Sequence, residues 1–181
     1  MAQIDLFANE LLEEAKRFLE RAEESPDSTA KSANRHASLM LAFCALEAHI
    51  NAIGEEFSRS SDLSAHEKAI LLEKEVRLED GVFTVTAALR MTRLEDRIEF
   101  LHTKFSGKKV DRSSTSWRGQ LSAAINLRNR LTHVREVPTI SEADVKRALE
   151  AVIATLTALY KAIYHAKFHP AGRGLSSKLD F

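Results

Sequence analysis

Residues 117–134, WRGQLSAAINLRNRLTHV, are the stretch around which the rest of the chain is organised. Successive residues of an α-helix are turned by about 100°, and the apolar residues of this stretch recur at that spacing. We expect the face of the helix that packs in the core to hold Ala124, Leu127, Leu131 and Val134. The stretch ends in a polar cluster, Arg128, Asn129, Arg130, Thr132 and His133.

The polar cluster has the residue types that phosphodiester chemistry needs. Asn129 and His133 are four residues apart and share a face, and Arg128 lies between that face and the core face. An arginine binds phosphate oxygens with two parallel hydrogen bonds, and a histidine transfers a proton near neutral pH. RNA supplies its own nucleophile, the 2′-hydroxyl, so a metal is not required. The alternative is that Arg128 or Arg130 only forms an ion pair with a neighbouring helix.

Three segments resemble the HEPN superfamily. Residues 127–133, LRNRLTH, match its motif of an arginine, four to six residues and a histidine, here Arg128 and His133 with the polar Asn129 directly after the arginine. Residues 43–53, FCALEAHINAI, are similar to the second helix of the family, with Glu47 at its acidic or polar position. Residues 63–76, LSAHEKAILLEKEV, are similar to one bacterial subgroup. The resemblance covers most of residues 30–165.

This resemblance implies an all-α bundle that forms a homodimer through the motif helices, so that two copies of the motif face one cleft. Active members of the family are metal-independent endoribonucleases, often toxins or host-defence effectors. In that role Arg128 would hold the scissile phosphate, His133 would transfer a proton and Asn129 would orient them or the substrate. Other members bind nucleotides or RNA, or only scaffold.

Five further residues are candidates for contacts with a substrate. Glu47 and Asn51 are four apart beside an apolar stripe, where they either make a structural polar contact or line the same cleft as Arg128. Residues 106–116, SGKKVDRSSTS, are a basic loop whose Lys108 and Lys109 either touch an RNA backbone or are only solvated. Arg130 belongs to the motif cluster itself.

Hydrophobic periodicity predicts helices over residues 3–24, 28–58, 64–78, 87–105, 117–134 and 141–166. Residues 82–86 are β-prone, and we expect an extended connector or an edge hairpin element. The fold class is therefore an up-and-down four-helix bundle with an extra helical insertion around residues 62–105. We expect one domain over residues 1–167 and a partly disordered tail over residues 168–181.

Composition narrows the possible functions. Lys and Arg number 26, as do Asp and Glu, so the formal net charge is zero and gives no general attraction to nucleic acid. The one cysteine, Cys44, lies in an apolar run and is expected to be a buried core thiol. The N-terminus does not resemble a signal peptide and no window predicts a membrane span, so we expect a cytoplasmic protein.

The sequence predicts no cofactor and no metal, because it has no glycine-rich phosphate loop and no cysteine cluster. His165 and His169 are four apart, but no third ligand lies near them. We expect RNA as a possible partner and no DNA partner.

Two functions remain open at this stage. The first is a metal-independent endoribonuclease with a composite Arg/His site. The second is a non-catalytic RNA-binding, nucleotide-binding or scaffold module of a toxin–antitoxin or defence system, with an antitoxin or another protein as its partner. The neutral charge favours the second.

Overall fold

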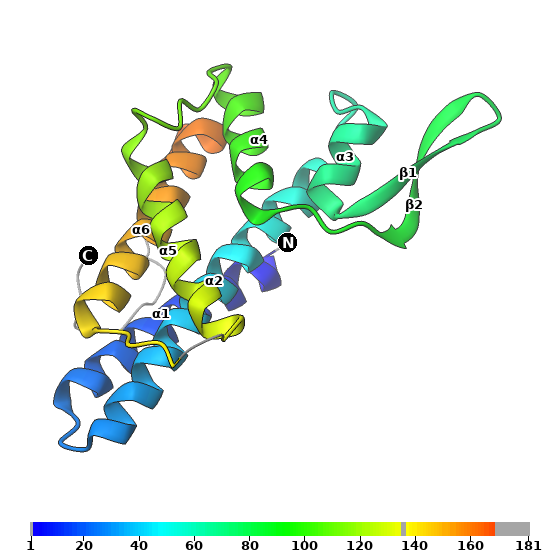
Figure 1. Ribbon diagram of the computed structural model, residues 1–181. Coiled ribbons are helices and arrows are strands. Elements are labelled where there is room, and N and C mark those ends of the chain that lie inside the picture. Colours follow the sequence, from blue (N-terminus) through cyan, green and yellow to red (C-terminus); the bar gives the residue numbers. More distant parts are fainter. Residues whose placement is uncertain (1, 135–136, 169–181) are drawn as a thin grey trace.

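A computed structural model describes residues 2–134 and 137–168, and they form a mostly helical fold with one small sheet (Figure 1). The elements in chain order are α1 (Ala2–Glu24), α2 (Ser28–Phe57), α3 (Ala65–Leu72), β1 (Lys74–Glu79), β2 (Val82–Leu89), α4 (Leu94–Ser106), α5 (Ser116–Thr132) and α6 (Glu142–Tyr164). The four long predicted helices, α1, α2, α5 and α6, are confirmed to within two residues at each end.

Local sequence signals set where these long helices begin. The Asp27 carboxylate accepts a hydrogen bond from the Ala30 backbone N–H at 2.6 Å, which caps α2 directly after the break at Pro26. At the start of α6, Ser141 and Asp144 form a reciprocal capping box. Side-chain caps satisfy backbone N–H groups that a helix start would otherwise leave unpaired.

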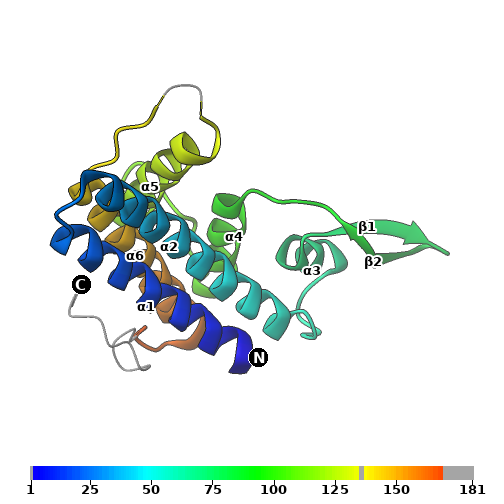
Figure 2. The same ribbon diagram turned by 90° about the horizontal axis from the view of Figure 1, so that it is seen from below.

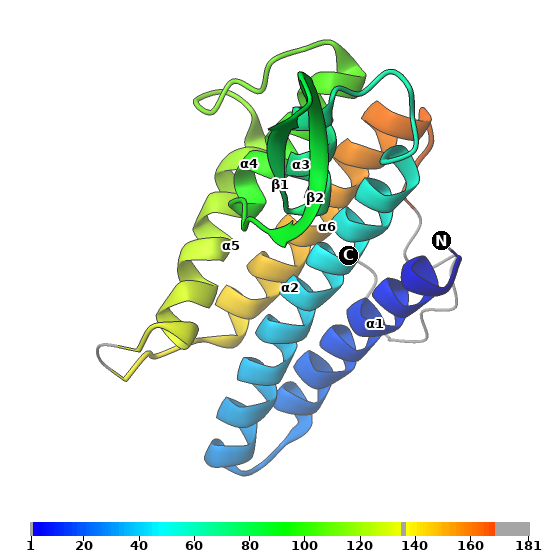
Figure 3. The ribbon, with the colours of Figure 1, turned by 90° about the vertical axis from the view of Figure 1, so that its right-hand side faces the viewer.

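Helices α1, α2, α5 and α6 run alongside one another, and α6 packs against each of the other three (Figure 3). The short connection between α5 and α6 makes them antiparallel neighbours, as expected. Their facing stripes form one core of fully buried aliphatic side chains, which includes Leu12, Leu19, Leu39, Leu46, Ile50, Leu121, Leu149 and Leu156.

The insertion departs from the prediction because part of it is a β-hairpin. The helix expected over residues 64–78 begins at its capping box but ends at Leu72, where Glu73 takes a left-handed conformation with φ 52°. The following residues form β1, which pairs antiparallel with β2 through a turn at Asp80 and Gly81, both with positive φ. The helix expected from residue 87 begins only at Leu94. The prediction of an edge hairpin element over residues 82–86 is therefore confirmed.

The insertion is joined to the long helices through α3 and α4, while the hairpin projects outward (Figure 2). Ile98 and Leu101 of α4 are fully buried in the common core. Gly54 lets α3 approach α2 closely, since a Cβ at that position would lie 2.8 Å from the Leu71 carbonyl oxygen. The buried Arg97 guanidinium donates to that same carbonyl at 2.8 Å and forms an ion pair with Glu73 at 3.1 Å.

The structure bears in part on the expected C-terminal tail and on the expected lack of a membrane-spanning helix. Phe168, the first residue of the expected tail, is buried, and residues 169–181 lie outside the described part of the chain. Among the described helices, α2 is long and apolar enough to cross a membrane by length and composition alone. The sequence pattern had predicted no such helix. Of the most apolar window of α2, 61% is buried inside the protein, as in the core helix of a soluble fold.

Candidate functional site

The motif helix α5 packs on the core with a different face from the predicted one. Leu121, Ala124 and Ile125 are buried, whereas Leu127 and Leu131 are half-buried and Val134 is exposed. The expected core face is therefore only partly correct. Val134 is exposed because the helix ends at Thr132, two residues before it, and the true core stripe instead continues toward Arg128.

Arg128 lies against α2 at the end of this core stripe. Its guanidinium carbon is 5.1 Å from the ring centroid of Phe43, which is within the range of a cation–π interaction. Its Nε is buried without a hydrogen-bond partner, and the ion pairs found among the described residues do not include Arg128. Among residues 2–134 and 137–168, Arg128 is thus a half-buried cation without a carboxylate at ion-pair distance.

Cys44 lies close enough to Arg128 for their charges to interact. Desolvation raises the pKa of the Cys44 thiol, the Glu47 carboxylate raises it further, and Arg128 partly opposes both. The side chain of Cys44 is exposed, so the expected buried core thiol is wrong. Its position one residue after the buried Phe43 turns Cys44 out of the core.

The other motif residues line a separate hollow of about 690 Å³ at the C-terminal end of α5. Its walls are Asn126, Asn129, Arg130, His133, Val137, Pro138 and Thr139. His133 is the C-cap of α5, where its backbone N–H donates to the Asn129 carbonyl at 2.8 Å and its side chain is exposed. Arg130 donates to the Thr139 carbonyl at 2.9 Å, which holds the connector against the helix. Asn129, Arg130 and His133 are therefore brought together.

Arg128 does not line that hollow, so one chain does not unite the predicted catalytic pair. His133 is five positions after Arg128, which corresponds to a turn of about 140° around a helix axis. Arg128 consequently faces α2 while Asn129 and His133 face the connector. The hollow therefore holds His133 without Arg128.

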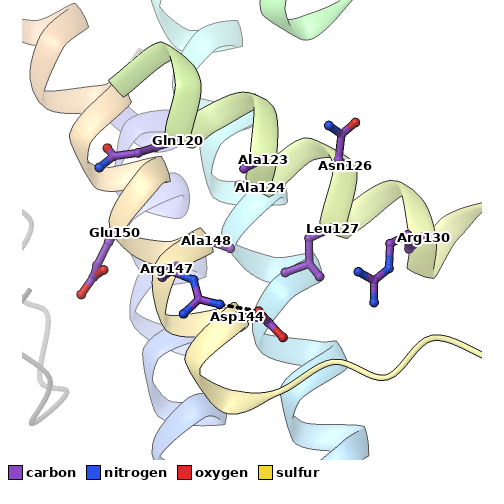
Figure 4. Close-up of a pocket in the computed structure, with 10 residues that line it drawn as sticks. All are labelled: Gln120, Ala123, Ala124, Asn126, Leu127, Arg130, Asp144, Arg147, Ala148 and Glu150. Atoms are coloured by element: carbon purple, nitrogen blue, oxygen red, sulfur yellow. Dashed lines mark hydrogen bonds and ion pairs between the residues drawn. The ribbon is translucent and has the colours of Figure 1, made fainter. Parts of the chain in front are cut away.

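A groove of about 600 Å³ between α5 and α6 continues from the hollow (Figure 4). Asn126 and Arg130 line both spaces. The remaining lining residues are Gln120, Ala123, Ala124, Leu127, Asp144, Arg147, Ala148 and Glu150. Its charges are balanced. Arg147 pairs with Asp144 at 2.5 Å, and the remaining charges are one positive, on Arg130, and one negative, on Glu150. This groove gives an anion no net attraction.

The four other candidates for substrate contacts lie outside the hollow and the groove. Asn51 is exposed, and its Oδ1 accepts a hydrogen bond from Arg97 at 2.8 Å, which favours the structural contact considered above. Glu47 is on the same exposed side of α2, near Cys44 and Arg128. Lys108 and Lys109 are exposed in the loop before α5.

The sequence did not single out Arg118, which is buried at the N-terminal end of α5. Its Nη1 lies 2.9 Å from the Glu95 carboxylate, and its Nε pairs with Glu99. Arg112 also binds Glu99, at 3.0 Å. Burial tends to raise the pKa of the Glu99 carboxyl, but the hydrogen bonds from Arg112 and Arg118 lower it overall. The only available signal was the four-residue spacing of Glu95 and Glu99, which puts both carboxylates on one face of α4.

Comparisons with protein-family models, with curated proteins and with solved structures find no match to this chain. Within residues 2–134 and 137–168, no three histidine, cysteine or acidic side chains are placed to hold a metal ion. The site is therefore characterised by its own geometry. One side of α5 carries Arg128, which has no ion-pair partner in the described part of the chain, and the other side carries the His133 imidazole with Asn129 and Arg130 beside it.

Proposed function

We propose that the protein is a HEPN-like, metal-independent endoribonuclease whose site is composed of Arg128 from one copy and His133 from a second copy. The observation that carries this proposal is the condition of Arg128. It is a half-buried guanidinium with no carboxylate partner among the described residues. A desolvated cation without a counter-ion attracts a phosphate more strongly than a solvated or paired one.

The chemistry needs only the groups that this pair supplies. His133 accepts the proton of the RNA 2′-hydroxyl, and the 2′-oxygen attacks the adjacent phosphorus. The bond from phosphorus to the 5′-oxygen breaks, and that oxygen leaves with a proton from solvent. Arg128 stabilises the negative charge that builds up on the phosphate oxygens. The products are a 2′,3′-cyclic phosphate end and a 5′-hydroxyl end.

Asn129 and Arg130 fit positioning roles in the same site. Asn129 shares the hollow with His133, so its amide can orient the imidazole or a ribose hydroxyl. Arg130 fixes the connector through Thr139 and leaves its other guanidinium N–H groups for the RNA backbone. We include in the proposal that α1, α2, α5 and α6 are the up-and-down bundle of the family, since these helices alternate in direction along the chain (Figure 3).

The experiment that tests this function is cleavage of single-stranded RNA in the presence of EDTA. We expect cutting by the wild type, and a loss of about 10²–10³-fold in rate for Arg128→Met and for His133→Asn. The chain offers a matched control for each variant. Arg21 also lies over a ring, 5.9 Å from the Phe18 centroid, and His165 is also a helix C-cap. Arg21→Met and His165→Asn should retain the wild-type rate, and equal rates in all four variants would refute the proposal.

A specific observation favours the non-catalytic alternative. The α5–α6 groove combines the small side chains of Ala123 and Ala148 with balanced charges at its rim. Such a surface suits a protein helix better than RNA. A scaffold function predicts that Glu150→Lys weakens binding to a partner protein while RNA cleavage stays undetectable in the wild type. Detection of EDTA-resistant, Arg128-dependent cleavage would exclude a purely non-catalytic role.

A further inference from the structure

The two edges of the β-hairpin differ in charge. β1, KEVRLE, carries Lys74, Glu75, Arg77 and Glu79 along its six residues, and Arg77 pairs with Glu75 at 2.9 Å. β2, VFTVTAAL, carries no charged side chain in eight residues. Because the sheet has two strands, each strand has one edge without a strand partner in the described part of the chain. Charged side chains on an edge strand discourage pairing with another chain, so only the β1 edge is protected.

The hairpin also exposes large apolar side chains. Leu78, Val82, Phe83 and Leu89 are between 53% and 73% exposed. α3 covers only part of this surface, where the Phe83 ring lies 4.7 Å from the His66 ring. The hairpin projects beyond α3 into solvent (Figure 2). A two-stranded sheet is marginally stable in water, and additional strands would stabilise it.

We propose that the β2 edge pairs antiparallel with the β2 edge of a second copy of this chain, which makes a four-stranded sheet in the order β1-β2-β2-β1. A two-fold axis perpendicular to the sheet makes the two β2 strands antiparallel by symmetry. β2 is a suitable partner for itself, because Val82, Thr84 and Val85 are β-branched and the pairing brings no like charges together.

The faces of the hairpin select the register of this pairing. Leu78 pairs with Phe83, Val76 with Val85 and, beyond a register shift, Lys74 with Leu89, so Phe83, Val85 and Leu89 of β2 share one face. Only registers that place odd-numbered residues opposite odd-numbered residues keep this face continuous. An axis through Thr86, in the segment where the β1–β2 register shifts, places Phe83 opposite Leu89 of the second copy. Both of these exposed apolar side chains are then covered in each copy.

This contact is separate from the Arg128 and His133 site, since the hairpin and the C-terminal end of α5 lie apart (Figure 2). If the motif helices also dimerise and the two two-fold axes meet at right angles, the assembly closes as a tetramer, and loss of the hairpin contact leaves a dimer. If they do not, the wild type is a dimer and loss of the hairpin contact leaves a monomer. In both cases the mass of the assembly falls to about half.

Charge reversal at the axis tests the pairing. Thr86→Lys or Thr86→Glu opposes two identical charges only in the paired state, so we expect each variant to have about half the wild-type mass by light scattering. An equimolar mixture of the two variants should regain the wild-type mass, since opposite charges then face each other. This rescue distinguishes lost pairing from misfolding. Ser32→Lys, which adds the same charge on an exposed position of α2, should keep the wild-type mass.

A monomeric wild type, a wild-type mass in both Thr86 variants, or a mixture that does not regain mass would overturn the proposal. RNA cleavage by these variants reports separately on the Arg128 and His133 site, because Thr86 lies outside the hollow and the groove.

Discussion

The two ends of α5 place an arginine in opposite electrostatic surroundings. Arg118, in the first turn, has a side chain that is 7% exposed and bound by the carboxylates of Glu95 and Glu99. Arg128, in the last two turns, rests on the ring of Phe43 and has no carboxylate within ion-pair distance among the described residues. In the described part of the chain, one helix thus carries an arginine with two carboxylate partners and an arginine with none.

This difference separates a structural role from a functional one. Arg118 joins α5 to α4, and its charge is satisfied within the fold. Arg128 is partly desolvated without a counter-ion, which costs stability and is retained only where another property compensates. Affinity for an external anion such as phosphate is such a property. The predictions below test whether the two arginines differ in this way.

The largest expected effect on folding comes from Arg118→Met. Removal of this cation leaves the buried Glu95 and the half-buried Glu99 with only the exposed Arg93 and Arg112 as partners, and we expect the free energy of unfolding to fall by about 1–3 kcal/mol. Arg128→Met keeps the aliphatic contact with Phe43, and the loss should stay below about 1 kcal/mol. Urea denaturation of both variants measures the difference. Equal losses would mean that Arg128 is also a structural arginine.

A smaller effect is expected from acid. The Glu99 carboxyl has a pKa below its ordinary value near 4.5, because the hydrogen bonds from Arg112 and Arg118 outweigh the effect of burial. Below that ordinary value the unfolded chain binds a proton that the native state still excludes, so stability decreases as the pH falls. This contribution is fully present above pH 4.5 and is lost as the pH falls through the native pKa of Glu99.

Arg118→Met should therefore flatten the loss of stability between pH 6 and pH values below 4.5, whereas Arg128→Met should leave it unchanged. Thermal denaturation across that range provides the measurement. The acidic groups outside this cluster act equally in both variants and cancel in the comparison. A wild-type slope in Arg118→Met would show that Glu99 does not depend on this cation.

The smallest effect is the coupling between Arg128 and the Phe43 ring. A double-mutant cycle of Phe43→Leu and Arg128→Met should give an interaction energy of about 0.5–1 kcal/mol. The Phe43→Leu cost in the core appears in both arms of the cycle and cancels. A coupling near zero would mean that the ring does not hold the guanidinium in place.

Sequence periodicity predicted the long helices well because each carries its own apolar stripe, and because side-chain caps mark the starts of α2 and α6. It failed for Lys74–Glu79, because KEVRLE is rich in helix-forming residues and its strand conformation depends on pairing with β2. The end of α3 was also hidden, because Glu73 rather than a glycine takes the left-handed conformation there.

The sequence predicted which residue types form the candidate site, but not which way all of their side chains face. The spacing of Asn129 and His133 correctly placed them on one face, which lines the hollow. The side of α5 that faces the core depends on how α5 packs against α2 and α6. The sequence pattern of α5 alone therefore predicted full burial of Leu127 and Leu131, which are only half-buried. Arg118 was missed because its partners come from α4, about twenty residues earlier in the chain.

The most direct test of the composite site mixes two inactive variants. Copies with Arg128→Met and copies with His133→Asn are unfolded together and refolded, so that mixed dimers form. A mixed dimer has one site with both mutations and one site with neither, so RNA cleavage in EDTA should return to about a quarter of the wild-type rate. A mixture as inactive as either variant alone would contradict a site that takes Arg128 and His133 from different copies.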